Sequence, residues 1–193
     1  MPRIDRSSLM TLEEYARKRP QFRAEVMAHK KNRAVSLGEH LLLVFEDELT
    51  VRYQVQEMLR IEKIFEEEAI REELNAYNPL VPDGGNLKAT MMLEYPDPEE
   101  RRKQLENLIG IEDRVWVEAD SCGRIWATAD EDLERESEHK TSSVHFLRFE
   151  FTESMVQKLK QGASLAIGVD HPNYRWSVVA PPAVRDALAK DLE

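Results

Sequence analysis

The chain has 193 residues, of which 33% are charged and 41% hydrophobic, and its formal net charge is −10. This length suits one large domain with a buried core. The longest apolar run, Leu41 to Phe45, is far shorter than the roughly 20 residues that span a bilayer, which argues against a membrane protein. The single cysteine, Cys122, excludes an internal disulfide, and the N-terminus has no apolar signal segment. We therefore expect an acidic cytoplasmic protein.

The charge is unevenly distributed along the chain. Residues 1–33 contain nine Lys and Arg against four Asp and Glu, a net charge of +5, so the remainder carries −15. The acidic remainder argues against double-stranded nucleic acid as a partner. Residues 1–33 are predicted to form a basic helical N-terminal arm within a single domain that covers 1–193. Packing of this arm on the protein's own acidic surface is favoured over contact with RNA or an acidic partner.

The first half of the chain is predicted to be mainly helical. Thr11 and Glu14 form a capping box that begins a helix, and Pro20 is expected to interrupt it. The stretch Glu48 to Tyr77 contains no Gly or Pro, and its apolar residues recur every three or four positions. One long helix is therefore predicted there. The run Leu41 to Glu46 before it fits either a strand or the start of a helix.

The second half of the chain alternates predicted strands with short helices. Turn residues and alternating apolar residues indicate strands at 87–95, 114–119, 124–129, 143–151, 165–169 and 174–179, and helices at 98–109, 153–160 and from 181 to about 188. The charged segment Asp130 to Lys140 is predicted to be a solvated helix or loop. Because several links between strands are too short for parallel crossovers, antiparallel pairing is favoured. The prediction is a single α+β domain, with a mostly antiparallel sheet of five or six strands packed against a long central helix and additional N- and C-terminal helices.

Two histidines in or beside predicted strands are candidate site residues. His145 shares a strand face with apolar side chains, where histidine is less common than on the surface. His171 lies in a loop that also supplies Tyr174, and loops on rigid hairpins often carry function. Histidine is a frequent metal ligand and acid–base group near neutral pH. The alternative for both histidines is a hydrogen-bonded structural role.

The predicted long helix carries a second group of candidates, which consists of Arg52, Gln54, Glu57 and Arg60. Two guanidinium groups and a carboxylate on one side could form an anion or substrate cleft. A structural network of Arg–Glu pairs is the favoured alternative. An enzyme or metal site would combine Glu57, Arg60, His145 and His171 between helix and sheet. No nucleotide-binding, hydrolase or zinc motif appears, so the sequence leaves any cofactor or metal unidentified.

The segments YQVQEMLRIEK, ELNAYNPLVPDGGNLKATMMLEYPDPEERRKQL, VHFLRFEF and GVDHPNY resemble, in this order, a bacterial family of unknown function. The resemblance extends from about Leu9 to Leu188. Members are often encoded beside a rubrerythrin-like protein and an iron–sulfur oxidoreductase, which implies such a protein as a partner. The resemblance implies no catalytic residue.

The function predicted from the residues and the resemblance is that of a cytoplasmic accessory or binding protein linked to redox or iron/peroxide metabolism. The first alternative is a metal- or anion-binding enzyme with a site between the long helix and the sheet. A weaker alternative is an RNA-binding accessory protein that uses the basic arm.

Overall fold

The computed structural model describes residues 4–131 and 139–193, and their strands form two antiparallel sheets. Sheet A has the strand order β1-β2-β3-β7-β6, and its strands are β1 (Ala34–Leu37), β2 (Leu41–Glu46), β3 (Asn86–Leu93), β7 (Val144–Glu150) and β6 (Thr128–Ala129). Sheet B has the order β5-β4-β8-β9, and its strands are β5 (Arg124–Trp126), β4 (Val115–Ala119), β8 (Leu165–His171) and β9 (Tyr174–Val179).

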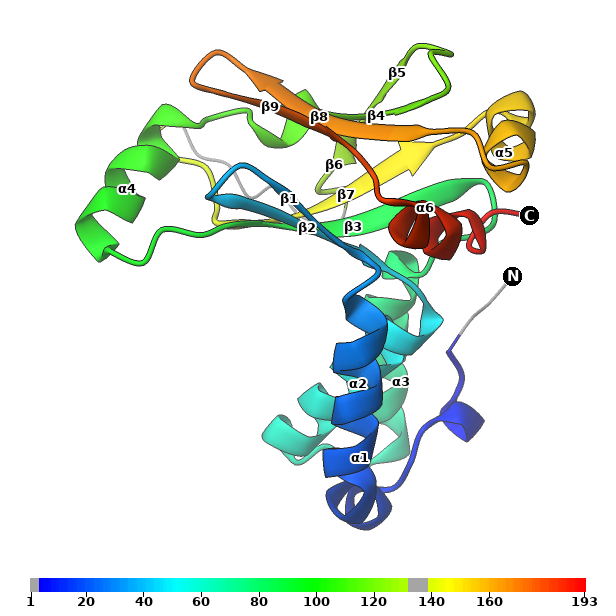
Figure 1. The fold of residues 1–193 in the computed structure, drawn as a ribbon. Helices are drawn as coiled ribbons and strands as arrows, with labels where there is room; N and C mark the ends of the chain where they lie inside the picture. Colours follow the sequence, from blue (N-terminus) through cyan, green and yellow to red (C-terminus); the bar gives the residue numbers. More distant parts are fainter. Residues whose placement is uncertain (1–3, 132–138) are drawn as a thin grey trace.

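The two sheets face each other and enclose the main hydrophobic core (Figure 1). Alternation along each strand puts one set of side chains inside: Leu87, Ala89 and Met91 of β3 are buried there. The helices α4 (Pro98–Asn107), α5 (Glu153–Lys160) and α6 (Pro182–Ala189) contribute apolar side chains to the same core. We call this part of the molecule the sandwich.

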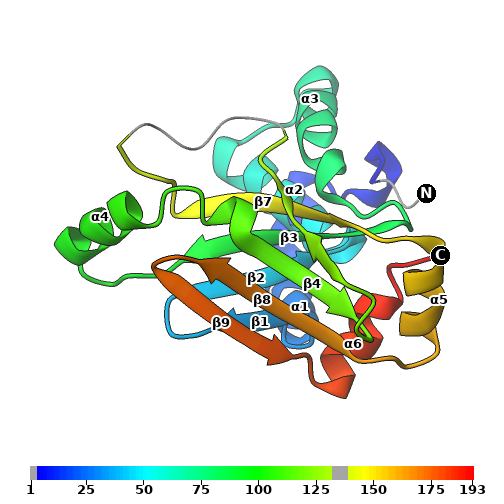
Figure 2. The ribbon, with the colours of Figure 1, turned by 90° about the horizontal axis from the view of Figure 1, so that it is seen from above.

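A second part of the molecule, the helical lobe, projects from the side of sheet A that faces away from sheet B (Figures 1 and 2). It consists of η1 (Arg6–Ser8), α1 (Leu12–Lys30), α2 (Glu48–Glu62), α3 (Glu67–Tyr77) and η2 (Asn78–Leu80). Two small apolar clusters, separate from the main core, hold these helices together. No helix in the described ranges is long and apolar enough to cross a membrane.

The prediction of one long helix from Glu48 to Tyr77 is wrong, because the structure divides this stretch into α2 and α3. Lys63 ends α2 in a left-handed conformation with φ of 55°, and α3 begins at Glu67. The break lets α3 fold back so that Ile70 and Leu74 pack with the apolar stripe of α2. That stripe lies in the cluster of the lobe rather than in the core between the sheets.

The predicted interruption at Pro20 is also wrong, because α1 runs continuously from Leu12 to Lys30. Proline removes one hydrogen-bond donor, and this leaves the carbonyl of Ala16 without its usual helical partner. Both Pro20 and Ala16 are exposed, so water can satisfy that carbonyl. The apolar contacts of Tyr15, Phe22 and Val26 hold the two halves of α1 against the lobe.

The buried guanidinium of Arg33 joins the lobe to the sandwich. It donates to the carbonyl oxygens of Phe45 and Glu46 at 2.9 and 3.1 Å, and it pairs with Asp191 near the C-terminus. It also lies 3.4 Å from the carboxylate of Asp47, the N-cap of α2. Residues of the basic arm therefore pair with carboxylates of the same chain.

The predicted α+β class, the single domain and the antiparallel pairing are confirmed. The second sheet was not predicted, and the reason lies in residues 114–129. Trp126 of β5 pairs with Trp116 of β4 in sheet B, so these two strands form a hairpin. The next residues, β6, instead pair with Arg148 and Leu147 of β7 in sheet A. Most of the segment Asp130 to Lys140, at 132–138, lies outside the described residues.

Candidate functional site

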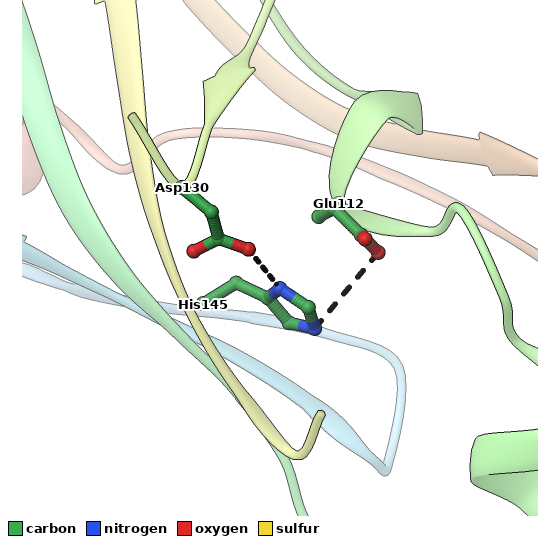
Figure 3. Close-up of side chains that lie close together, drawn as sticks. All are labelled: Glu112, Asp130 and His145. Atoms are coloured by element: carbon green, nitrogen blue, oxygen red, sulfur yellow. Dashed lines mark hydrogen bonds and ion pairs between the residues drawn. The ribbon is translucent and has the colours of Figure 1, made fainter. Parts of the chain in front are cut away.

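His145 lies at the centre of a polar cluster buried between the two sheets. Its strand, β7, pairs with β3 so that His145 lies opposite Met91 on the inner face, and its side chain is fully buried. Figure 3 shows that the ring points toward Asp130, which follows β6, and toward Glu112 of η3 (Glu112–Arg114). Three segments far apart in the sequence thus bring an imidazole and two carboxylates together.

Asp130 holds one side of the imidazole ring. Its Oδ2 lies 2.5 Å from His145 Nδ1, and its Oδ1 accepts the backbone N–H of Phe146 at 3.0 Å. The backbone N–H of Asp130 donates to the carbonyl of Phe146 at 2.9 Å, which fixes the residue against β7. Asp130 has φ of 47°, a left-handed conformation that costs energy for a residue other than glycine. The fold thus maintains a strained residue that orients the ring.

Three oxygen atoms surround the other ring nitrogen. His145 Nε2 lies 2.9 Å from the Thr141 hydroxyl, 3.0 Å from the Ser142 carbonyl oxygen and 3.8 Å from Glu112 Oε2. The Thr141 hydroxyl is also 3.2 Å from Glu112 Oε2, to which it donates. A carbonyl oxygen can only accept, so the hydrogen bond to Ser142 requires a proton on Nε2.

The same oxygen atoms are suitable metal ligands. Ligand atoms about 2.1 Å from one cation lie about 3.0 Å apart at right angles and about 3.4 Å apart in a tetrahedron. The Thr141 hydroxyl and the Ser142 carbonyl oxygen, at 2.9 and 3.0 Å from Nε2, match the right-angled separation, and Glu112 Oε2, at 3.8 Å, lies somewhat beyond the tetrahedral one. A ligating histidine usually donates its other N–H to a carboxylate, which is the place that Asp130 takes at Nδ1. One donor atom from each of Glu112, Asp130 and His145 lies within 4.8 Å of the others.

The predicted site residues on the helix lie elsewhere and hold the lobe together. Glu57 accepts the Tyr15 hydroxyl at 2.6 Å and binds Arg19 through both oxygens at 2.6 and 2.9 Å. Arg60 approaches the same carboxylate at 3.4 Å. The hydrogen bonds from Arg19 lower the pKa of Glu57 to about 2, although burial opposes this. Glu57 therefore joins α2 to α1.

Arg52 and Gln54 flank the same helix in different environments. Arg52 lies 3.4 Å from Glu48, and its guanidinium is over the ring of Phe22. Gln54 donates to Glu46 at the end of β2 at 3.1 Å. These contacts join α2 to α1 and to sheet A, as a structural network would.

His171 and Tyr174 flank the turn between β8 and β9 in sheet B. His171 Nε2 lies 3.0 Å from the carbonyl of Ile109, and its Nδ1 accepts the backbone N–H of Asn173 at 3.2 Å. Tyr174 donates to the carbonyl of Leu37 at 2.6 Å, which ties β9 to the β1–β2 turn. His145 and His171 thus lie in different sheets with different partners.

Glu112, Asp130 and Thr141 are functional candidates that the sequence alone did not predict. Glu112 and Asp130 are 18 residues apart in the chain, Asp130 and Thr141 are 11 apart, and Thr141 and His145 are 4 apart. This spacing matches no metal-binding motif. The charged residues that follow Asp130 predict a solvated segment there. His145 is the one residue whose sequence context indicates such a cluster. A histidine on an apolar strand face needs buried polar partners.

The fold and site define an α+β protein with a buried carboxylate–histidine cluster between two antiparallel sheets. The chain belongs to the family described as "Protein of unknown function (DUF3501)", which matches residues 3–192. It is similar to a protein of unknown function from Burkholderia pseudomallei whose crystal structure has been determined. The two are 55% identical over 100% of both chains, with a TM-score of 0.95. None of the curated proteins compared with the chain matches it.

Proposed function

We propose that this protein binds a divalent transition-metal ion through His145 Nε2 and the carboxylate of Glu112. The observation that carries the proposal is that the two nitrogens of the His145 ring have different surroundings. Asp130 occupies Nδ1, whereas Nε2 faces a hydroxyl and a carbonyl oxygen at ligand spacing and the Glu112 carboxylate at 3.8 Å. A metal would replace the proton on Nε2 and leave the Asp130 hydrogen bond in place.

The donor set favours particular metals. Carboxylate, hydroxyl and carbonyl oxygens suit hard cations such as Mn²⁺, whereas imidazole suits Fe²⁺ and Zn²⁺. One imidazole among several oxygens therefore favours Mn²⁺ or Fe²⁺. Cys122 is the only cysteine of the chain and lies in the β4–β5 turn, so thiolate ligation plays no part in this cluster.

The test measures bound metal and thermal stability of the purified protein. At a metal concentration 100 times Kd, binding to the folded state contributes about 2.7 kcal/mol, which raises Tm by about 5–10 °C for a chain of this size. His145→Gln and Glu112→Gln should each abolish this increase. His171→Gln is the matched control, because it removes another buried histidine with two hydrogen bonds. Sub-stoichiometric iron, manganese and zinc, with no change of Tm on adding any of them, would refute the proposal.

We also propose, as the biological setting, that the protein is a cytoplasmic accessory to a redox iron protein. Support comes from the family resemblance, and a site that takes Fe²⁺ or Mn²⁺ would suit that setting. Sedimentation of the chain mixed with a purified rubrerythrin-like protein tests it. If the two proteins sediment independently at concentrations of tens of micromolar, the rubrerythrin-like protein is ruled out as the partner.

A further inference from the structure

A cavity of about 480 Å³ lies between the end of the helical lobe and the outer face of sheet A. Ala76, Tyr77, Pro79 and Leu80, from α3 and η2, line it on the lobe side. Phe146 of β7 lines it on the sheet side. The size falls in the range of small-molecule sites, and the lining is mainly apolar with a few polar groups, as is usual for such sites.

The polar groups of the cavity form one row across the sheet. Glu46 of β2 pairs in register with Lys88 of β3, which pairs with Arg148 of β7, so the three side chains leave the same face side by side. Lys88 donates to the carbonyl oxygens of Pro79 and Val81 at 2.7 and 3.0 Å. It thereby fixes the lobe side of the cavity over the sheet. Burial lowers the pKa of Lys88.

The guanidinium group of Arg148 already binds the carboxylate of Glu131, in the position that the carboxylate of a ligand would take. Its Nε and Nη2 donate to the two oxygens of Glu131 at 2.8 and 2.9 Å, which is the bidentate geometry of guanidinium–carboxylate recognition. Glu131 itself lines the cavity, and its side chain is 52% exposed. Exposed ion pairs contribute little to stability, so this carboxylate can be displaced at low cost. Glu150 pairs with the remaining nitrogen, Nη1.

We propose that this cavity binds a monocarboxylate with an apolar body. The carboxylate replaces that of Glu131 on Arg148, and the apolar body lies on Phe146 beneath Pro79 and Leu80. The assignment is independent of the metal site, because Phe146 and Arg148 face away from the sandwich whereas His145 faces into it.

Octanoate and 1-octanol are matched probes, since they differ only in the end group. Isothermal titration should show octanoate binding with at least tenfold higher affinity than octanol. Arg148→Gln should weaken octanoate binding at least tenfold. Glu131→Gln should strengthen it several-fold, because the variant removes the internal competitor. Arg124→Gln, which changes an arginine paired with Asp170 in sheet B, should leave binding unchanged.

The Glu131→Gln variant separates recognition from a structural role of the ion pair. If the pair only stabilised the fold, both partners' variants would lower Tm and neither would increase affinity. Equal binding of octanoate and octanol, weaker octanoate binding by Glu131→Gln, or no binding of octanoate at millimolar concentration would each overturn the proposal. The Glu131→Gln result stands even if Arg148→Gln fails to fold.

Discussion

The sandwich and the helical lobe are stabilised in different ways. The sandwich has one continuous core to which both sheets and three helices contribute. The lobe has two small apolar clusters, and polar contacts such as Glu57 with Arg19 and Tyr15 join its helices. Hydrophobic stabilisation grows with the area buried, so the sandwich is expected to hold the larger share of the folding free energy. The lobe depends more on a few specific pairs.

This difference also separates the two candidate sites. The Glu112–Asp130–His145 cluster is enclosed by the sandwich, where both sheets hold the donors in place. The carboxylate cavity lies where the lobe meets the outer face of sheet A, and Lys88 spans the two sides. Rigid surroundings suit a metal site, and a boundary between two structural parts is a common place for a small-molecule site.

The largest effect is expected from a truncation in the core of the sandwich. Phe149 of β7 is fully buried and packs against Phe45 of β2. Phe149→Ala should lower the free energy of unfolding by about 3–5 kcal/mol, because it removes buried apolar area and leaves a cavity. Urea unfolding measures the loss. Hydrogen exchange should increase in both parts of the molecule, since the lobe is built on sheet A.

A smaller and local effect is expected from a truncation in the lobe. Leu59 of α2 is buried in the cluster with Ile70 and Leu74 of α3. Leu59→Ala should cost about 2–4 kcal/mol. Because the lobe has its own clusters, hydrogen exchange should increase in α1, α2 and α3 while β3 and β8 keep their protection. Equal loss of protection in the lobe and the sandwich would show that the two unfold as one unit.

Local signals in the sequence were sufficient for most elements of the sandwich. Asp97 and Thr152 cap α4 and α5, and these helices begin at Pro98 and Glu153, where the sequence predicts them. The turn between β8 and β9 lies between the strands predicted at 165–169 and 174–179, and β8 extends two residues beyond the prediction, to His171. These features depend on neighbours in the chain, which a sequence shows directly.

The errors arose where distant contacts decide the structure. The break at Lys63 has no Gly or Pro to mark it, and only the packing of α3 on α2 explains it. Residues 128–129 join sheet A because of pairing with β7, which is not visible in the hairpin itself. The cluster around His145 has the same origin, since Glu112 and Asp130 reach it only after both sheets form. Single-sequence patterns carry no record of such pairings.

The smallest effect is expected from one ion pair of the lobe, compared with a second pair of the same chemistry. The side chain of Glu57 is 17% exposed and pairs with Arg19, whereas that of Glu67 is 64% exposed and pairs with Arg6. Glu57→Gln should lower the free energy of unfolding by about 2 kcal/mol at neutral pH, and Glu67→Gln by less than about 0.5 kcal/mol. Urea unfolding of both variants measures the difference.

The pH dependence of the free energy of unfolding shows whether ionised Glu57 stabilises the fold. Hydrogen bonds from Arg19 lower its pKa from 4.5 to about 2 in the folded protein, so the ionised form is favoured by folding. Its contribution is therefore complete above about pH 4.5 and is lost as the pH falls toward 2. The wild type and Glu57→Gln should converge in stability over this interval, whereas Glu67→Gln should follow the wild type throughout. Parallel curves of stability against pH for the wild type and Glu57→Gln would show that apolar clusters alone hold α1 to α2. The lobe and the sandwich would then differ only in the size of their apolar clusters.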